Sequence, residues 1–213
     1  DPDAAVGEDW LSLYETILKD VSLPYGLKAY LLRIDEQSLD RDYLSFYRER
    51  YVARIRLLKT VAEHCMPALM EAFDSVDTYI RPKQSKDGIE ERLLKGILLR
   101  TIVEANTGET HKTAENHFHR AWNITDRIST LHCINVSEHP HRLELMQEGY
   151  NLWKDHLSAY ASYLGIVGAG VHDDVFDLIA AEEKKKTFKI QHPTPSRALY
   201  LPVAGNNKML WTA

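Results

Sequence analysis

The stretch Phe118-His119-Arg120-Ala121-Trp122-Asn123-Ile124-Thr125-Asp126-Arg127 joins the end of one helical pattern to the start of another. The apolar residues around it recur at the three- and four-residue steps of a buried helical face: Ala114, Phe118 and Ala121 before it, and Ile128, Leu131 and Ile134 after it. Asn123 and Thr125 carry side-chain oxygens that can accept hydrogen bonds from the free N–H groups at a helix start. The stretch is therefore predicted to be a tight corner between two helices.

Helical spacing of apolar residues also covers the chain before this corner. The predicted stripes are Trp10, Leu13, Tyr14, Ile17, Leu18 and Val21; Leu27, Tyr30, Leu31 and Ile34; a long run from Leu44 to Phe73; and Leu94, Ile97, Leu98, Thr101, Ile102 and Ala105. Pro67 should kink or break the long run near Glu63, because an internal proline removes a hydrogen bond and clashes with the preceding turn. Asn106-Thr107-Gly108 is expected to end the fourth helix, since these residues tolerate a left-handed cap.

After the corner, the pattern predicts one long helix that is capped by Ser137. Its buried face is expected to carry Met146, Tyr150, Trp153, Leu157, Tyr160 and Leu164. The glycines at 165, 168 and 170 follow this helix with the spacing GxxGxG, whereas a phosphate-binding loop has GxGxxG after a strand. We therefore expect them to form a turn between helices.

The last part of the chain is predicted to be less regular. A short helix containing Val175, Leu178 and Ile179 should end at the lysine run 184–186. Beyond Phe188, the three prolines are expected to keep at least the first part of the segment from forming a regular helix; they are Pro193, Pro195 and Pro202.

No alternating strand pattern of convincing length occurs in the sequence. We predict an all-α fold, an irregular two-layer α-solenoid of about eight to ten antiparallel helices, superhelical in the manner of HEAT and armadillo repeats. The expected organisation is an N-terminal helical part over residues 1–76, a surface loop over 77–86, and a helical-repeat part over 87–213 that is truncated at its C-terminal end.

Composition narrows the range of partners. The 213 residues carry a formal net charge of −5, which gives no electrostatic reason to expect nucleic acid or an anionic membrane as a partner. No apolar run reaches the roughly 18 residues needed to span a bilayer. Cys65 and Cys133 form no CxxC motif, so a reducing, cytoplasmic location is expected.

The search for catalytic motifs finds no HExxH, no GxSxG and no Walker loop. Two HxH pairs stand out among the ten histidines, His117 with His119 and His139 with His141. Residues i and i+2 share a face on a strand but point apart on a helix, and both pairs lie on predicted helices or their first turns. Surface or capping roles are therefore expected, with zinc binding as the alternative.

Two further charged sites are considered. Glu182-Glu183, beside the lysine run, is expected to be a solvated face. Arg197 lies among prolines and apolar neighbours, where a guanidinium either clamps loop carbonyls or binds a carboxylate.

The amino-acid sequence of the corner is similar to that of a known family. Phe118-His119-x-Ala121-x-Asn123-Ile124-Thr125-Asp126 resembles the Phe-His-x-Ala-x-Asn-Met-Thr-Asp corner in the C-terminal helical domain of bacterial-type alanyl aminopeptidases (aminopeptidase N), which are zinc metallopeptidases. Flanking segments agree in order: Gly108-Glu109-Thr110-His111; Leu145-Met146-Gln147-Glu148 with Trp153; and Phe188, Pro193, Arg197, Leu199, Ala204, Gly205 and Asn207. The likeness is specific from Leu93 to Asn207 and weaker from Trp10 to Phe73. Four positions depart from the family pattern, so the polar network there must differ: His192, Thr194, Pro195 and Ala198.

The resemblance implies an intact enzyme that removes N-terminal amino acids from peptides. Its zinc would be held by an HExxH helix and a downstream glutamate, with a tyrosine stabilising the oxyanion, and none of these groups lies in this chain. The chain would then carry no metal ligand and no catalytic residue, and would be inactive alone. It would pack on the catalytic domain, enclose the active-site chamber and control substrate access.

The resemblance also bears on Arg197. This residue matches a family arginine that faces the internal cavity, which makes it the candidate residue for the substrate cavity. The alternative to the aminopeptidase interpretation is a free-standing helical-repeat scaffold whose concave face binds other proteins.

Overall fold

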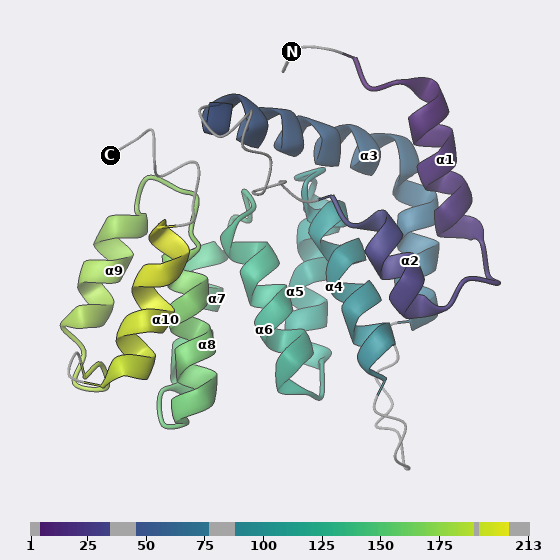
Figure 1. Cartoon of the computed structure of the whole chain (residues 1–213). Coiled ribbons are helices and arrows are strands. Elements are labelled where there is room, and N and C mark those ends of the chain that lie inside the picture. Colours follow the sequence, from purple (N-terminus) through teal and green to yellow (C-terminus); the bar gives the residue numbers. More distant parts are fainter. Residues whose placement is uncertain (1–4, 35–45, 77–87, 190–191, 205–213) are drawn as a thin grey trace. The chain divides into compact units, whose positions relative to one another are not determined.

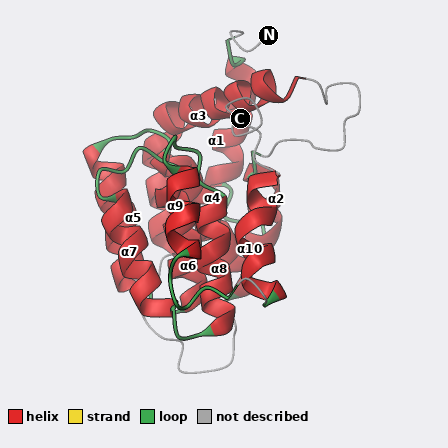
Figure 2. Ribbon diagram, turned by 90° about the vertical axis from the view of Figure 1, so that its left-hand side faces the viewer, coloured by secondary structure: helices red, strands yellow, loops and turns green. Residues whose placement is uncertain are grey.

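The structure is a computed structural model that describes residues 5–34, 46–76, 88–189 and 192–204. Helices are the regular elements of these residues, and Figure 2 shows them without a strand. The predicted all-α fold is confirmed. In the described part of the chain, none of the helices is long and apolar enough to cross a membrane.

The chain divides into two compact units, residues 1–126 and 127–213. The helices of the first unit are α1 (Glu8–Lys19), α2 (Tyr25–Leu32), α3 (Tyr47–Val76), α4 (Ile89–Val103) and α5 (Gly108–Arg120). The division falls within α6 (Ile124–Asn135), and the second unit continues with α7 (Arg142–Trp153), α8 (Leu157–Gly168), α9 (Val175–Glu183) and α10 (Pro193–Ala204). The predicted boundary loop at 77–86 lies outside the described residues, so it stays a prediction. By their packing contacts, α4 and α5 belong to the same unit as the helices that precede this loop.

Helix α4 is the centre of the first unit. It packs against α2, α3 and α5, and α1 packs against α2 and α3. Because α4 is covered on several sides, its buried side chains point in more than one direction. They include Leu94, Leu98, Leu99, Ile102 and Val103. The predicted helix end at 106–108 is confirmed, since Asn106 has a left-handed φ of 49° and Thr107 caps α5.

The buried face of α2 differs from the predicted one. Leu27, Tyr30 and Leu31 are exposed, Tyr30 by 75%, whereas Lys28, Ala29 and Leu32 face the core. Apolar residues occur around most of this short helix, so their spacing alone did not select a face. Long-range contacts select it instead. The Tyr14 hydroxyl donates to the Leu32 carbonyl at 3.0 Å, and the Glu90 carboxylate accepts from the Gly26 N–H at 3.1 Å at the helix start.

Two other helices of the first unit refine the prediction. In α1, Trp10 and Leu13 are exposed, and the core side chains are Leu11, Tyr14 and Leu18. Helix α3 continues through Pro67, so the proline does not break it. Figure 1 shows α3 changing direction along its length, which is the bend expected of an internal proline. The predicted start of the run near Leu44 lies outside the described residues.

The predicted long helix after Ser137 is two helices. Helix α7 ends at Trp153 and α8 begins at Leu157, with an extended His156 between them at φ −118° and ψ 105°. The apolar spacing of three and four residues runs from Trp153 to Tyr160 in the sequence only because Leu157 lies between them. Leu157 is 53% exposed, so it does not belong to a buried face. Ser137 does not cap a helix, since its hydroxyl donates back to the Ile134 carbonyl at 3.0 Å.

The expectation of an irregular segment after Phe188 is also wrong, because residues 193–204 form α10. Pro193 and Pro195 lie in its first turn, where backbone N–H groups have no partner within the helix, so a proline there costs no hydrogen bond. Pro202 lies in the last turn, where it removes one hydrogen bond to the preceding turn, and α10 still continues to Ala204. The position of Pro193 and Pro195 within the helix, which the sequence pattern alone did not give, explains why these two prolines are tolerated.

Helix α10 packs closely against α8 at a glycine. A Cβ atom added to Gly168 would lie 2.0 Å from the Leu199 carbonyl oxygen, which no side chain could avoid without movement of the backbone. One turn earlier, a Cβ on Gly165 would lie at an ordinary 3.7 Å from the Ala198 carbonyl. Gly165 and Gly168 lie within α8, so the predicted inter-helix turn is wrong for these two glycines. Gly170 does lie in the connection between α8 and α9, which begins at Val175.

The core of the second unit contains a polar network around Glu182. This glutamate is only 3% exposed, so the expectation of a solvated face is wrong for it. It accepts hydrogen bonds from the Tyr163 hydroxyl at 2.8 Å, the Tyr160 hydroxyl at 3.4 Å and the Lys185 ammonium at 2.6 Å. The Lys185 ammonium also lies 3.6 Å from the ring centroid of Tyr150. The network joins the ends of α7, α8 and α9 without an unpaired buried charge.

Substitution of Gly168 by alanine tests the contact between α8 and α10. We expect Gly168→Ala to lower the free energy of unfolding in urea by about 2 to 3 kcal/mol, because overpacking forces the backbones apart. Gly165→Ala is the matched control. It should be neutral or stabilising by up to about 1 kcal/mol, since alanine favours a helix and has room there. Equal effects of the two substitutions would contradict the close approach.

The tyrosines of the Glu182 network predict a loss of stability in alkali. Burial, reinforced by the Glu182 charge, raises the pKa of Tyr160 from 10.0 to about 12 and raises the pKa of Tyr163 in the same direction. Above pH 10 the unfolded chain therefore loses phenolic protons that the folded chain keeps, so stability is full below pH 10 and falls as the pH rises toward 12. Urea midpoints measured at pH 8, 10 and 11 should show this decline, and Tyr160→Phe should make it shallower.

Candidate functional site

The corner between α5 and α6 is held by its own side chains. Helix α5 ends at Arg120 and α6 begins at Ile124. The Asn123 side-chain oxygen accepts from the Asp126 backbone N–H at 2.8 Å, and the Asn123 amide donates to the Asp126 carboxylate at 2.9 Å. The predicted cap is confirmed for Asn123. Thr125 is exposed on the first turn of α6 and does not cap it.

A buried ion pair fastens this corner to α4. The Lys95 ammonium lies 2.5 Å from the Asp126 carboxylate, and the two residues are 5% and 2% exposed. Charged groups at this depth are found paired, because an unpaired charge would lose its hydration without compensation. Sequence reasoning missed Lys95, although a lysine between Leu94 and Leu98 of a buried helix is a signal that could have found it.

The side chains of the two HxH pairs have different surroundings. The buried His117 ring meets Phe73 edge-on at 5.3 Å, whereas His119 is exposed and packs against the ring of Phe118. The ring of His139 accepts the backbone N–H of His141 at 3.1 Å, and the two rings meet edge-on with their centroids 5.9 Å apart. In residues 5–34, 46–76, 88–189 and 192–204, no three histidine, cysteine, aspartate or glutamate side chains are grouped as metal ligands would be.

Arg197 lies on α10, between the buried Pro195 and the buried Leu199. Its side chain is exposed, and the described residues provide no hydrogen bond or ion pair to its guanidinium. The prediction that Arg197 clamps the carbonyl groups of a loop is therefore wrong, because Arg197 belongs to a helix. A cavity role remains a prediction, and the close contact of α10 with α8 is what would position the guanidinium.

These observations define an all-α helical-repeat protein in which the corner between α5 and α6 is a structural joint. A family model described as "Domain of unknown function (DUF3458_C) ARM repeats" matches residues 1–213. The chain belongs to this family, and the ARM-repeat description agrees with the predicted helical solenoid.

Two relatives connect the family to peptidases. The chain is 20% identical over 196 residues to aminopeptidase N of Escherichia coli K12, and the match covers 91% of this chain and 22% of that protein. The crystal structure of Legionella pneumophila aminopeptidase A in complex with aspartic acid has the same fold, with a TM-score of 0.78 and 15% identity. That match covers 96% of this chain and 25% of the other, so the chain spans about a quarter of the length of either relative. The resemblance to the helical domain of aminopeptidases is confirmed.

The buried ion pair predicts that loss of its lysine lowers stability much more than loss of an exposed lysine that is also paired. Lys95→Met should lower the free energy of unfolding by about 3 to 5 kcal/mol, because it leaves the Asp126 carboxylate buried without its cation. Lys59→Met is the control, since Lys59 and Glu63 form an exposed pair at 3.9 Å on α3, and it should change stability by less than about 0.5 kcal/mol. Equal urea midpoints for the two variants would show that the corner does not depend on this pair.

Proposed function

We propose that this chain is the C-terminal helical part of a zinc-dependent aminopeptidase that removes N-terminal amino acids from peptides. The match of the aminopeptidase-like sequence across nearly the whole chain carries the proposal. In this interpretation the chain packs on the catalytic domain, encloses the active-site chamber and controls which substrates enter it. The free cysteines Cys65 and Cys133 suit a cytoplasmic parent.

The chemistry would lie on other parts of the parent. Zinc in such enzymes polarises a carbonyl and activates water. The sequence of this chain has no HExxH motif, and its described residues do not group into a metal site, so they do not fit that metal. We therefore assign this chain no catalytic residue and no resident cofactor.

Arg197 is the residue through which this part would contact substrate. Its exposed guanidinium on a firmly packed helix is suited to bind a carboxylate or a peptide carbonyl. The contacts that hold α10 lie on its opposite, buried side, at Pro195 and Leu199. A charged group can thus be presented from α10 without weakening the core.

The function is tested with the full gene product and with this 213-residue chain. We expect the full product to hydrolyse alanine anilide, to contain about one zinc per chain and to lose activity with a chelator, whereas the 213-residue chain should do none of these. Arg197→Ala in the full product should raise KM for peptides by roughly tenfold, the loss of one charge-assisted hydrogen bond. The exposed Lys112 on α5 offers a control, and Lys112→Ala should leave KM unchanged.

Other outcomes distinguish the parts of the proposal. Hydrolysis by the 213-residue chain alone would refute the division of roles. An unchanged KM in Arg197→Ala would refute the cavity role and leave the aminopeptidase assignment standing. A full product without a metallopeptidase motif would favour the free-standing scaffold.

A further inference from the structure

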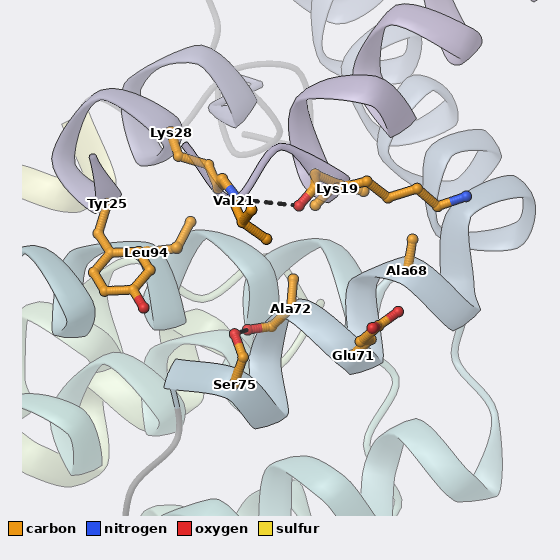
Figure 3. A pocket seen from close by; sticks show the side chains of 10 residues that line it. Lys19, Val21, Tyr25, Lys28, Ala68, Glu71, Ala72, Ser75 and Leu94 are labelled. Atoms are coloured by element: carbon orange, nitrogen blue, oxygen red, sulfur yellow. Dashed lines mark hydrogen bonds between the residues drawn. The ribbon is translucent and has the colours of Figure 1, made fainter. Parts of the chain in front are cut away.

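A pocket of about 380 Å³ lies in the first unit, where α1, α2, α3 and α4 meet (Figure 3). Its wall is mostly apolar and includes Leu18, Tyr25, Ala68, Ala72 and Leu94. The small side chains of Ala68 and Ala72 on α3 leave the space open. The volume is in the range of small-molecule sites, which are concave, largely apolar and contain a few oriented polar groups.

The polar group of interest is the ammonium of Lys28. Lys28 lines the pocket, is only 6% exposed, and donates one hydrogen bond at 3.1 Å to the Leu18 carbonyl at the end of α1, drawn as a dashed line in Figure 3. A lysine ammonium has three donors. Among the described residues, no other hydrogen-bond acceptor and no carboxylate within ion-pair distance serves the remaining two.

The other charges of the pocket do not neutralise Lys28. Asp20 is half-buried and accepts hydrogen bonds from the Ser22 N–H and hydroxyl. Lys28 acts on Asp20 only through the longer-range charge interaction that helps lower the pKa of Asp20. Lys19 is exposed and pairs with Glu15 at 2.6 Å. Glu71 comes from α3, and Figure 3 shows it on the side of Lys19, away from Lys28.

We propose that this pocket binds a small carboxylate with an apolar body, with the carboxylate on the Lys28 ammonium and the apolar part against Ala68, Ala72 and Leu94. A buried ammonium with donors to spare favours an anion, because a carboxylate would supply the missing counter-charge. The apolar wall selects against a bare inorganic anion. The carboxylate could belong to a free acid or to the C-terminus of a short apolar peptide, which share this chemistry. The inference goes beyond the proposed function and does not depend on it.

Calorimetric titration of the 213-residue chain with hexanoate tests the site. We expect one saturable site, with acetate, hexanol and hexylamine each binding at least tenfold more weakly. N-acetyl-alanyl-leucine, with a free C-terminal carboxylate or with a C-terminal amide, separates the two sources. Binding of the peptide with the carboxylate, but not of its amide, indicates peptide C-termini as the ligand. Binding of hexanoate, but of neither peptide, indicates small free acids. Either of these results supports the proposal, whereas equal binding of acetate and hexanoate, or of hexanol and hexanoate, overturns it.

Variants locate the binding. Lys28→Met should weaken hexanoate binding at least tenfold, and Ala72→Leu, which fills the pocket and keeps the ammonium, should do the same. Lys19→Met is the matched control, because it removes a cation from the rim that is already paired, and it should change binding by less than threefold. Thermal unfolding of each variant shows whether it is folded. Hexanoate binding that survives Ala72→Leu in a folded protein overturns the proposal even if Lys28→Met fails to fold.

Discussion

The contact between the Lys95 ammonium and the Asp126 carboxylate is the constraint on which the first unit depends. A charge at that depth is tolerated only with its partner in place, so α4 and the start of α6 must reach their native positions together. Asn123 shares the same carboxylate and caps α6 as well. The Asn123 side chain therefore caps α6, and the Asp126 side chain joins the start of that helix to α4 at the centre of the unit.

The same arrangement recurs in the second unit with different residues. Arg142 reaches the Asp174 carboxylate before α9 and the Asn135 side chain at the end of α6, and the Asn135 amide donates to the Ile166 carbonyl of α8. These helix junctions are thus fixed by polar contacts between side chains of different segments. Apolar packing supplies most of the burial, and these contacts specify which helix ends meet.

Local signals predicted much of this fold. The corner, the Asn123 cap and the end of α4 before the left-handed Asn106 depend on neighbouring residues, and they were predicted correctly. The buried face of α2, the break before Leu157 and the helix around Pro195 were not, because partners elsewhere in the chain or the position of a residue within its helix decide them. The same limit applied to the candidate sites. Lys28 and Glu182 are polar residues whose burial only the tertiary structure reveals.

The missing side chain at Gly168 has a consequence for Arg197. Because the Leu199 carbonyl occupies the place where a Cβ atom of residue 168 would lie, α10 approaches α8 more closely than any other residue at this position would allow. Arg197 lies two residues from this fixed point, so the register of the two helices sets how far its guanidinium extends. A methyl group added at position 168 would therefore displace Arg197 as well, although Gly168 is buried and the Arg197 side chain is exposed.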